Sequence, residues 1–251
     1  MKIFIRFLLL LFILANVVLA QTDASSQVAL GDSLYTRFEN PGALNAYLEA
    51  IKMDANNYEA NWKAARTYSD IGETLEGKTR SEYFKKSEIH SRQAVKIDST
   101  GAKGHLYLSI ALGRVALDAS AKERIQYSKE IKKEVDLAIK YDPTDDYAYH
   151  VLGRWNRKLA NLSWVEKTFA NIFLGGVPKE ASNENAASSF LKAIELNPTH
   201  INHYLELGMT YEMMGEEEKA RAAYQKCLDL PKSDSDDDTY KKEAEEKLKK
   251  L

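Results

Sequence analysis

Cysteine is nearly absent from this chain, and so is any strong imbalance of charge. Cys227 is the single cysteine among 251 residues, so no disulfide can form within the chain. The net charge of −2 supplies no basic field that would hold nucleic acid. No alternating apolar and polar run indicates a β-strand, and no Ser/His/Asp or Cys/His set can be assembled by spacing. We therefore expect neither a nucleic-acid-binding protein nor an enzyme.

The first twenty residues differ from the rest of the chain. Lys2 and Arg6 precede the apolar run FLLLLFILA, and small residues before Gln21 offer a cleavage position after Ala20. This order is typical of a secretory signal peptide, and the run is short for a membrane span of about 20 residues. Gln21 stands where a bacterial lipoprotein would need cysteine. We expect residues 1–20 to be removed and the mature protein to be periplasmic or secreted, with an uncleaved membrane anchor as the alternative.

One pattern recurs along the remaining chain, in a sequence whose 44% hydrophobic and 29% charged residues suit a soluble globular protein. A bulky residue is usually followed three places later by a small one, then by Ile, Val or Leu, then by Asp or Asn. The small residue falls at positions 50, 94, 138, 193 and 227, with spacings of 44, 44, 55 and 34 residues. The last spacing is the period of a tetratricopeptide repeat (TPR), and insertions of 10, 10 and 21 residues account for the others.

These units predict an all-α fold. Each unit reads as a helical hairpin with small residues where its two helices cross, and hairpins that cannot bury an apolar face alone stack into a right-handed superhelix. The repeat domain is expected over residues 21–232, followed by a charged capping helix over 233–251. About five units with insertions are expected, near residues 24–57, 58–101, 102–145, 146–200 and 201–232.

The insertion in the fourth unit, residues 160–176, is unusually apolar. Within it Leu162 and four further residues recur at helical spacing on one face. Two interpretations are open: the segment packs on the superhelix as extra core, or it offers an apolar surface to a partner or a membrane. Few basic residues accompany it, which weakens the membrane interpretation. The candidate docking residues are Val165, Phe169, Ile172 and Phe173.

Several stretches of the second half resemble one known family. YAYHVLGRW, LSWVEKTFANIFLGGVPKEAS, FLKAIELNPTHINHYLELGMTYEMMGEEEKA and CLDLP are similar to the regulator of microtubule dynamics family. The resemblance implies an all-helical, TPR-like fold and a non-enzymatic adaptor role; animal members are associated with microtubules, spindle poles and mitochondrial contact sites. With the export signal, it indicates an exported, bacterial member that serves as a protein-binding scaffold. A peripheral membrane protein or a cytoskeletal adaptor anchored by residues 1–20 is the alternative.

The first helices of TPR hairpins line the concave groove, where a protein or peptide partner is expected to bind. Aromatic residues and arginine dominate binding hot spots, and paired arginines can bind a carboxylate. The alternative is that the tryptophans belong to the core and the arginines pair with neighbouring acids. Counting from the repeat landmarks places these candidates in the groove: Asp32, Tyr35, Trp62, Arg66, His150, Arg154 and Arg157.

Three short motifs suggest cofactors, but each lacks its context. GETLEGKT, from Gly72, matches a phosphate-loop pattern but follows an expected helix instead of a strand. DSDDDTYKKEAE resembles a calcium loop but has Thr239 where the sharp turn needs glycine. His200, His203 and Glu206 have metal-ligand spacing without a further partner nearby. We expect no cofactor and no metal.

Overall fold

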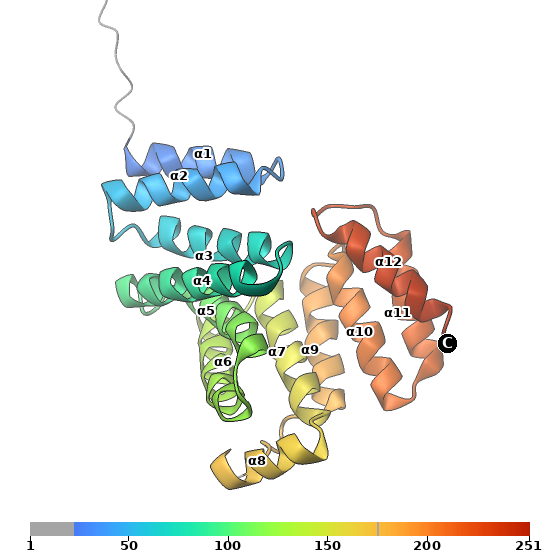
Figure 1. Cartoon of the computed structure of the whole chain (residues 1–251). Coiled ribbons are helices and arrows are strands. Elements are labelled where there is room, and N and C mark those ends of the chain that lie inside the picture. The colour runs from blue at the N-terminus through green and yellow to red at the C-terminus, as the bar shows by residue number, and fades with distance from the viewer. Residues whose placement is uncertain (1–22, 175) are drawn as a thin grey trace, which may run out of the picture.

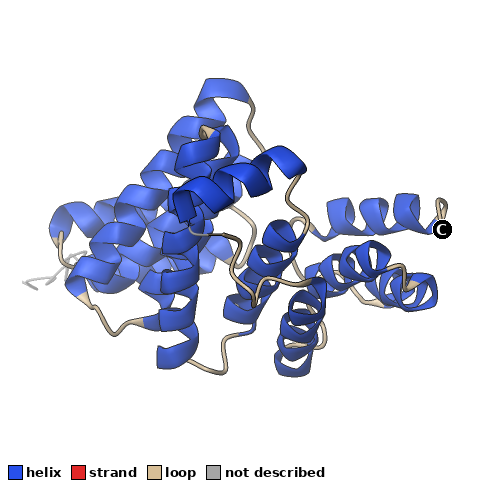
Figure 2. Ribbon diagram, turned by 90° about the horizontal axis from the view of Figure 1, so that it is seen from below, coloured by secondary structure: helices blue, strands red, loops and turns tan. Residues whose placement is uncertain are grey.

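The computed structural model describes residues 23–174 and 176–251, and these are almost entirely helical. Figure 2 shows helices and loops and no strand in this described part of the chain, as the sequence predicted. Twelve α-helices and one 3-10 helix follow one another over these ranges: α1 (Ala24–Tyr35), α2 (Asn40–Met53), α3 (Tyr58–Glu73), α4 (Gly77–Ile97), α5 (Ala102–Val115), η1 (Ala116–Asp118), α6 (Ala121–Tyr141), α7 (Asp146–Ala160), α8 (Trp164–Leu174), α9 (Asn183–Leu196), α10 (Ile201–Met214), α11 (Glu217–Asp229) and α12 (Asp237–Leu248).

The helices associate as hairpins that stack side by side (Figure 1). The pairs are α1 with α2, α3 with α4, α5 with α6, α7 with α9, and α10 with α11. Each pair also packs on the next, and α12 packs on α10 and α11 at the end of the stack. The predicted all-α, TPR-like architecture is confirmed, and the hairpins create an inner wall formed mainly by the first helix of each pair.

The small residues of the repeat pattern occupy equivalent places in the five hairpins. Each lies near the end of its second helix and is at most 1% exposed, from Ala50 to Cys227. In four hairpins the backbone N–H of the next Asp or Asn, four residues on, donates to the carbonyl of this alanine at 2.9 Å and ends the helix. The repeated Ala-x-x-x-Asp/Asn sequence therefore encodes both the close helix crossing and the helix stop.

Glycine allows close helix crossings where an aromatic ring covers the first helix. A Cβ added to Gly208 would lie 2.4 Å from the Tyr224 ring, and one added to Gly153 would lie 2.8 Å from the Phe190 ring. Tyr224 and Phe190 are fully buried. In these two hairpins the second helix thus stacks a ring directly on the backbone of the first, which explains why glycine stands at positions 153 and 208.

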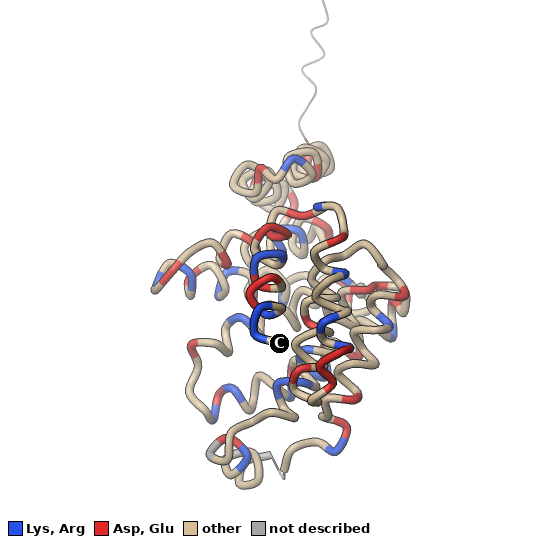
Figure 3. The backbone as a smooth tube through the Cα atoms, turned by 90° about the vertical axis from the view of Figure 1, so that its right-hand side faces the viewer, with Lys and Arg blue, Asp and Glu red and all other residues tan. Residues whose placement is uncertain are grey.

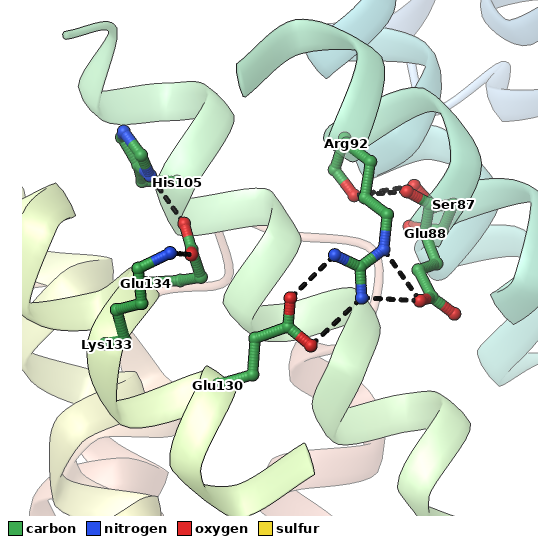
Figure 4. A network of polar contacts seen from close by, with 8 residues as sticks. Ser87, Glu88, Arg92, His105, Glu130, Lys133 and Glu134 are labelled. Atoms are coloured by element: carbon green, nitrogen blue, oxygen red, sulfur yellow. Dashed lines mark hydrogen bonds and ion pairs between the residues drawn. The ribbon is translucent and has the colours of Figure 1, made fainter. Parts of the chain in front are cut away.

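The insertions take two structural forms. In units two and three they lengthen the second helices, so that α4 and α6 each have 21 residues against 14 in α2. Polar contacts then tie these long helices together (Figure 4): Arg92 of α4 binds both oxygens of Glu130 in α6 at 2.6 and 3.0 Å. His105 of α5 contacts Glu134 of α6 at 2.6 Å. These contacts join the second helices of units two and three to each other and to α5.

The third insertion forms α8, which projects from one side of the stack and packs beside α6 (Figure 1). Ala170 is buried there, whereas Trp164 and Ile172 are 80% and 67% exposed. The side chains of the other predicted docking residues, Val165, Phe169 and Phe173, lie outside the described residues. No helix within the described ranges has both the length and the apolar character needed to cross a membrane.

Candidate functional site

The inner wall encloses a cavity of about 960 Å³. Side chains of α1, α3, α5, α6 and α7 line it, and the segment before α12 approaches from the far end of the stack. Figure 1 shows that segment, between α11 and α12, turned toward α3. Cavities of this size are typical of ligand sites. Both the first and the last repeat unit contribute residues to the lining of this cavity.

Five of the seven predicted groove residues line the cavity: Tyr35, Arg66, His150, Arg154 and Arg157. Asp32 and Trp62 do not. Asp32 accepts hydrogen bonds from Tyr47 Oη at 2.8 Å and from Lys63 Nζ at 2.7 Å, so it joins α1 to α2 and α3. Trp62 stacks on Tyr107 of the next unit, with ring centroids 5.4 Å apart. Both residues therefore stabilise contacts between helices.

At one end of the cavity, α1 and α3 bring an aromatic ring, a cation and a carboxylate together. The Arg66 guanidinium lies 3.5 Å from the centroid of the Tyr35 ring, and Tyr35 Oη donates to Asp70 Oδ2 at 2.9 Å. Burial raises the pKa of Asp70 to about 7. Asp70 was not among the predicted residues, although it follows Arg66 by one helical turn, a spacing that places both on one face.

The opposite wall, on α7, is cationic. Arg157 is 8% exposed and donates to the Glu206 carbonyl at 2.9 Å and to its carboxylate, as the alternative interpretation of the arginines expected. Arg154 lies 3.4 Å from the same carboxylate. Lys158, which the sequence analysis missed, also lines the cavity. Burial and the neighbouring guanidinium of Arg154 lower the pKa of Lys158.

The segment before α12 supplies carboxylates to the lining of the cavity. Asp234 and Asp236 are among the lining residues, and burial together with the carboxylate of Glu73 raises the pKa of Asp236. Asp237 fixes the segment by accepting from the backbone N–H groups of Ser233 and Asp234, each at 2.7 Å. The acidic stretch considered as a calcium loop is therefore a short turn that lines the cavity, followed directly by the first turns of α12.

Three histidines gather where α7 meets α10. His150 Nδ1 and His203 Nδ1 lie 2.9 Å apart, and His203 Nε2 lies 2.9 Å from an Asp146 oxygen. The His200 ring lies 4.3 Å from that of His203. Burial lowers the pKa of His200 to about 4 and that of His150 well below its usual value. In the described part of the chain no three His, Cys, Asp or Glu residues are arranged to hold a metal ion.

The remaining motif, GETLEGKT, spans the end of α3 and the start of α4. A helix precedes it, so the strand that a phosphate loop requires is not there. Charges of both signs alternate along the described backbone, notably on α12 (Figure 3). Charged groups of both signs line the cavity, among them Asp234 and Asp236 before α12 and three cations on α7.

Comparison with known proteins gives consistent matches over the helical region. A family model described as regulator of microtubule dynamics protein 1-3 matches residues 28–251. Regulator of microtubule dynamics protein 3 of Rattus norvegicus is 31% identical over 187 residues, which make up 74% of this chain and 40% of that protein. Regulator of microtubule dynamics protein 1 of Caenorhabditis elegans is 27% identical over 189 residues, 75% of this chain and 83% of that protein. The aligned region thus spans less than half the length of the rat protein.

Solved structures support the fold. A thermophilic TPR protein of Thermus thermophilus superimposes with a TM-score of 0.64 and 20% identity, covering 88% of this chain and 98% of that one. The pilF protein of Pseudomonas aeruginosa superimposes with a TM-score of 0.54 and 15% identity, covering 91% of both chains. At these identities the similarity shows the TPR-like fold alone.

Proposed function

The chain belongs to the regulator of microtubule dynamics protein family, and from that premise we propose that it is an exported, non-enzymatic binding protein. Its concave cavity holds an extended peptide segment of a partner protein. The observation that carries this proposal is the cavity itself, enclosed by the inner helices and lined by Tyr35, Arg66 and Arg154. Aromatic and arginine side chains in a partly enclosed site are the types that contribute most to protein recognition.

An enzymatic function has less support than peptide binding, because the contacts of the serine and cysteine side chains do not suggest catalysis. The hydroxyl of Ser109 donates to the Leu106 carbonyl at 2.6 Å, and that of Ser128, another serine of the wall, accepts from Trp155 Nε1 at 3.1 Å. Cys227 lies at the other end of the stack, with no exposed surface. A nucleophile activated by an adjacent base is the usual sign of covalent catalysis, and these contacts are those of structural side chains.

A blocking substitution tests the cavity. Gly113 lines it, and a Cβ added there would meet only Ile131, at 4.0 Å. Gly113→Phe should therefore fold normally and fill the space, whereas Ser188→Phe on the exposed face of α9 is a matched control. The probe is a dye-labelled pool of random hexapeptides, read by fluorescence polarisation. Binding that Gly113→Phe abolishes and Ser188→Phe preserves is expected; binding unaffected by Gly113→Phe would place peptide recognition elsewhere.

Native mass spectrometry of the purified protein provides an independent test. A peptide retained by the unmutated protein and lost from Gly113→Phe supports the proposal. A small amphiphile retained in the same way would contradict the peptide assignment, because it would show the cavity serving another class of ligand. The same instrument tests export: a mass lower by residues 1–20 is expected from cells that process the chain, and an intact N-terminus would favour an anchored adaptor.

A second candidate function rests on α8. Trp164 and Ile172 are 80% and 67% exposed on a helix that projects from the stack, and tryptophan favours membrane interfaces. Liposome flotation of the unmutated protein, compared with a Trp164→Ala and Ile172→Ser double variant, tests peripheral membrane binding. Flotation that the double variant loses would support it. Absence of flotation by the unmutated protein would remove the membrane role and leave the cavity as the proposed site.

A further inference from the structure

We propose that Arg154 and Lys158 form an anion subsite in the cavity, which binds a carboxylate of the partner's peptide segment. The inference rests on the proposed function, because it names the chemistry that the cavity recognises. It differs from the expectation drawn from the sequence, which paired Arg154 with Arg157. The structure assigns Arg157 to Glu206 and places Lys158 at the cavity wall instead.

Helix geometry brings the two cations together. Arg154 and Lys158 are one turn apart on α7, so their side chains leave the same face about 6 Å apart along the axis. Both line the cavity, and Leu162 continues the same wall below them. Arg157 engages α10, where Glu206 lies. A single carboxylate placed between Arg154 and Lys158 can therefore contact both.

Positive charge exceeds negative charge on this wall. Arg114 of α5 pairs with Glu73, and Arg157 pairs with Glu206. Arg154 shares Glu206 through a longer contact of 3.4 Å. Within the described residues, ion pairs closer than 4.0 Å engage these three arginines but do not include Lys158. Arg124 and Glu166, which also line the cavity, lie 3.9 Å apart. Five cations thus face three carboxylates, and a bound anion would reduce this excess of positive charge.

The pKa values of the cations on this wall agree with the excess of positive charge. Burial lowers the pKa of Lys158, and the positive charges of Arg154 and Arg114 lower it further. Burial also lowers the pKa of Arg114, with Arg154 acting in the same direction. Like charges held together in a partly desolvated site are unfavourable until a counter-charge enters. The fold keeps three cations in this arrangement, which is the preorganisation that anion binding needs.

The distribution of charge across the cavity favours a peptide as the occupant. Asp234 and Asp236 line the cavity near Glu73 of α3, whereas Arg154 and Lys158 lie on α7. Apolar lining such as Ile110, Val151 and Ile131 is interspersed. A ligand that satisfies both ends must carry a cationic group, apolar groups and a carboxylate on one extended backbone. Peptides combine these groups, and a simple anionic amphiphile lacks the cationic one.

Two labelled pools of hexapeptides with amidated C-termini test the subsite, so that the side chain at one position is the sole source of a carboxylate. One pool has glutamate and the other glutamine at the fourth position, and all other positions are random but exclude acidic residues. The glutamate pool is expected to bind the unmutated protein about tenfold more tightly, since a charge-assisted contact in a partly desolvated site is stronger than a neutral one. The preference should shrink as NaCl rises from 50 to 500 mM, because the cations are partly exposed to salt.

The variants are Arg154→Gln and Lys158→Gln, separately and together, with Lys96→Gln on an exposed part of α4 as control. The double variant should bind both pools alike, and the control should keep the preference. Circular dichroism checks that each variant folds. If the unmutated protein binds both pools equally, the anion subsite is wrong while the peptide cavity stands. If it binds neither pool, the peptide function itself is wrong.

Discussion

His150 and His203 lie 53 residues apart in the sequence, yet their Nδ1 atoms are 2.9 Å apart in the interface of α7 and α10. His203 has no exposed surface and His150 is 4% exposed. His200 covers them from the start of α10. Only one carboxylate, that of Asp146, contacts the cluster among the described residues. Adding protons here would place like charges together in a buried site.

Acidification is therefore expected to destabilise the fold through this cluster. The pKa of His200 is lowered to about 4 and that of His150 is well below normal, whereas both would return to about 6.5 in the unfolded chain. The contribution to stability is full above pH 6.5 and is lost as the pH falls toward the folded pKa, with a slope of at most about 1.4 kcal/mol per pH unit for each histidine.

Urea unfolding at pH 7.5, 6.0 and 5.0 measures this effect. A His150→Asn and His200→Gln double variant should lose less stability between pH 7.5 and 5.0 than the unmutated protein. The raised pKa of Asp70 acts in the opposite direction over part of this range, but it is present in both proteins and cancels in the comparison. Equal losses in the two proteins would show that the cluster is not responsible.

Two glycines on first helices should respond oppositely to alanine. In Gly208→Ala the new Cβ would lie 2.4 Å from the Tyr224 ring, and relief of that overlap should cost about 1–3 kcal/mol. In Gly113→Ala the nearest atom is 4.0 Å away, and the better helix propensity of alanine should contribute about 0.5–1 kcal/mol. Thermal unfolding followed by circular dichroism compares both, and a Gly208→Ala protein as stable as the original would contradict the close crossing.

The Arg157–Glu206 pair is expected to behave as a buried ion pair. Both side chains are at least nine-tenths buried. Arg157→Met should cost about 3–5 kcal/mol, because it leaves the Glu206 charge without its main partner. Adding Glu206→Gln to Arg157→Met should recover part of that loss, since the uncompensated charge is then removed. Urea unfolding of the single and double variants checks this; a double variant less stable than Arg157→Met would exclude the explanation.

The single thiol should be unreactive in the folded protein. Cys227 has no exposed surface, and burial raises its pKa to about 12, so almost no thiolate forms at pH 8. Its reaction with a thiol-specific disulfide reagent should therefore be slow in buffer and fast in 6 M guanidinium chloride. Absorbance of the released thiolate measures both rates. Rapid labelling without denaturant would contradict the packing of α11 against α12.

The sequence determines the hairpins well because their signals are local. Ala50, Ala94, Ala138 and Ala193 mark four helix crossings, and the Asp or Asn four residues on marks each helix end. The long second helices and the apolar insertion of the fourth unit are also visible as changes in spacing. Each of these features depends on residues within one or two turns, where periodicity and helix-stop signals are reliable.

The cavity is harder to predict because its shape depends on contacts between units. Trp62 is of a residue type that is common in binding sites, but its ring stacks on Tyr107 of the next hairpin. Arg157 and Lys158 are adjacent in sequence, yet Arg157 pairs with Glu206 whereas Lys158 has no such partner among the described ion pairs. Asp234 and Asp236 reach the site only because the stack curves, and no local pattern encodes that curvature.

The return of the segment before α12 toward α3 has a mechanical consequence. The width of the cavity depends on how closely the first and last hairpins of the stack approach each other. Each junction between neighbouring hairpins contributes a small rotation to that approach. Partner affinity should therefore respond to substitutions at junctions such as Trp62–Tyr107 that touch no ligand. Affinity for the partner is therefore set by the geometry of the whole superhelix.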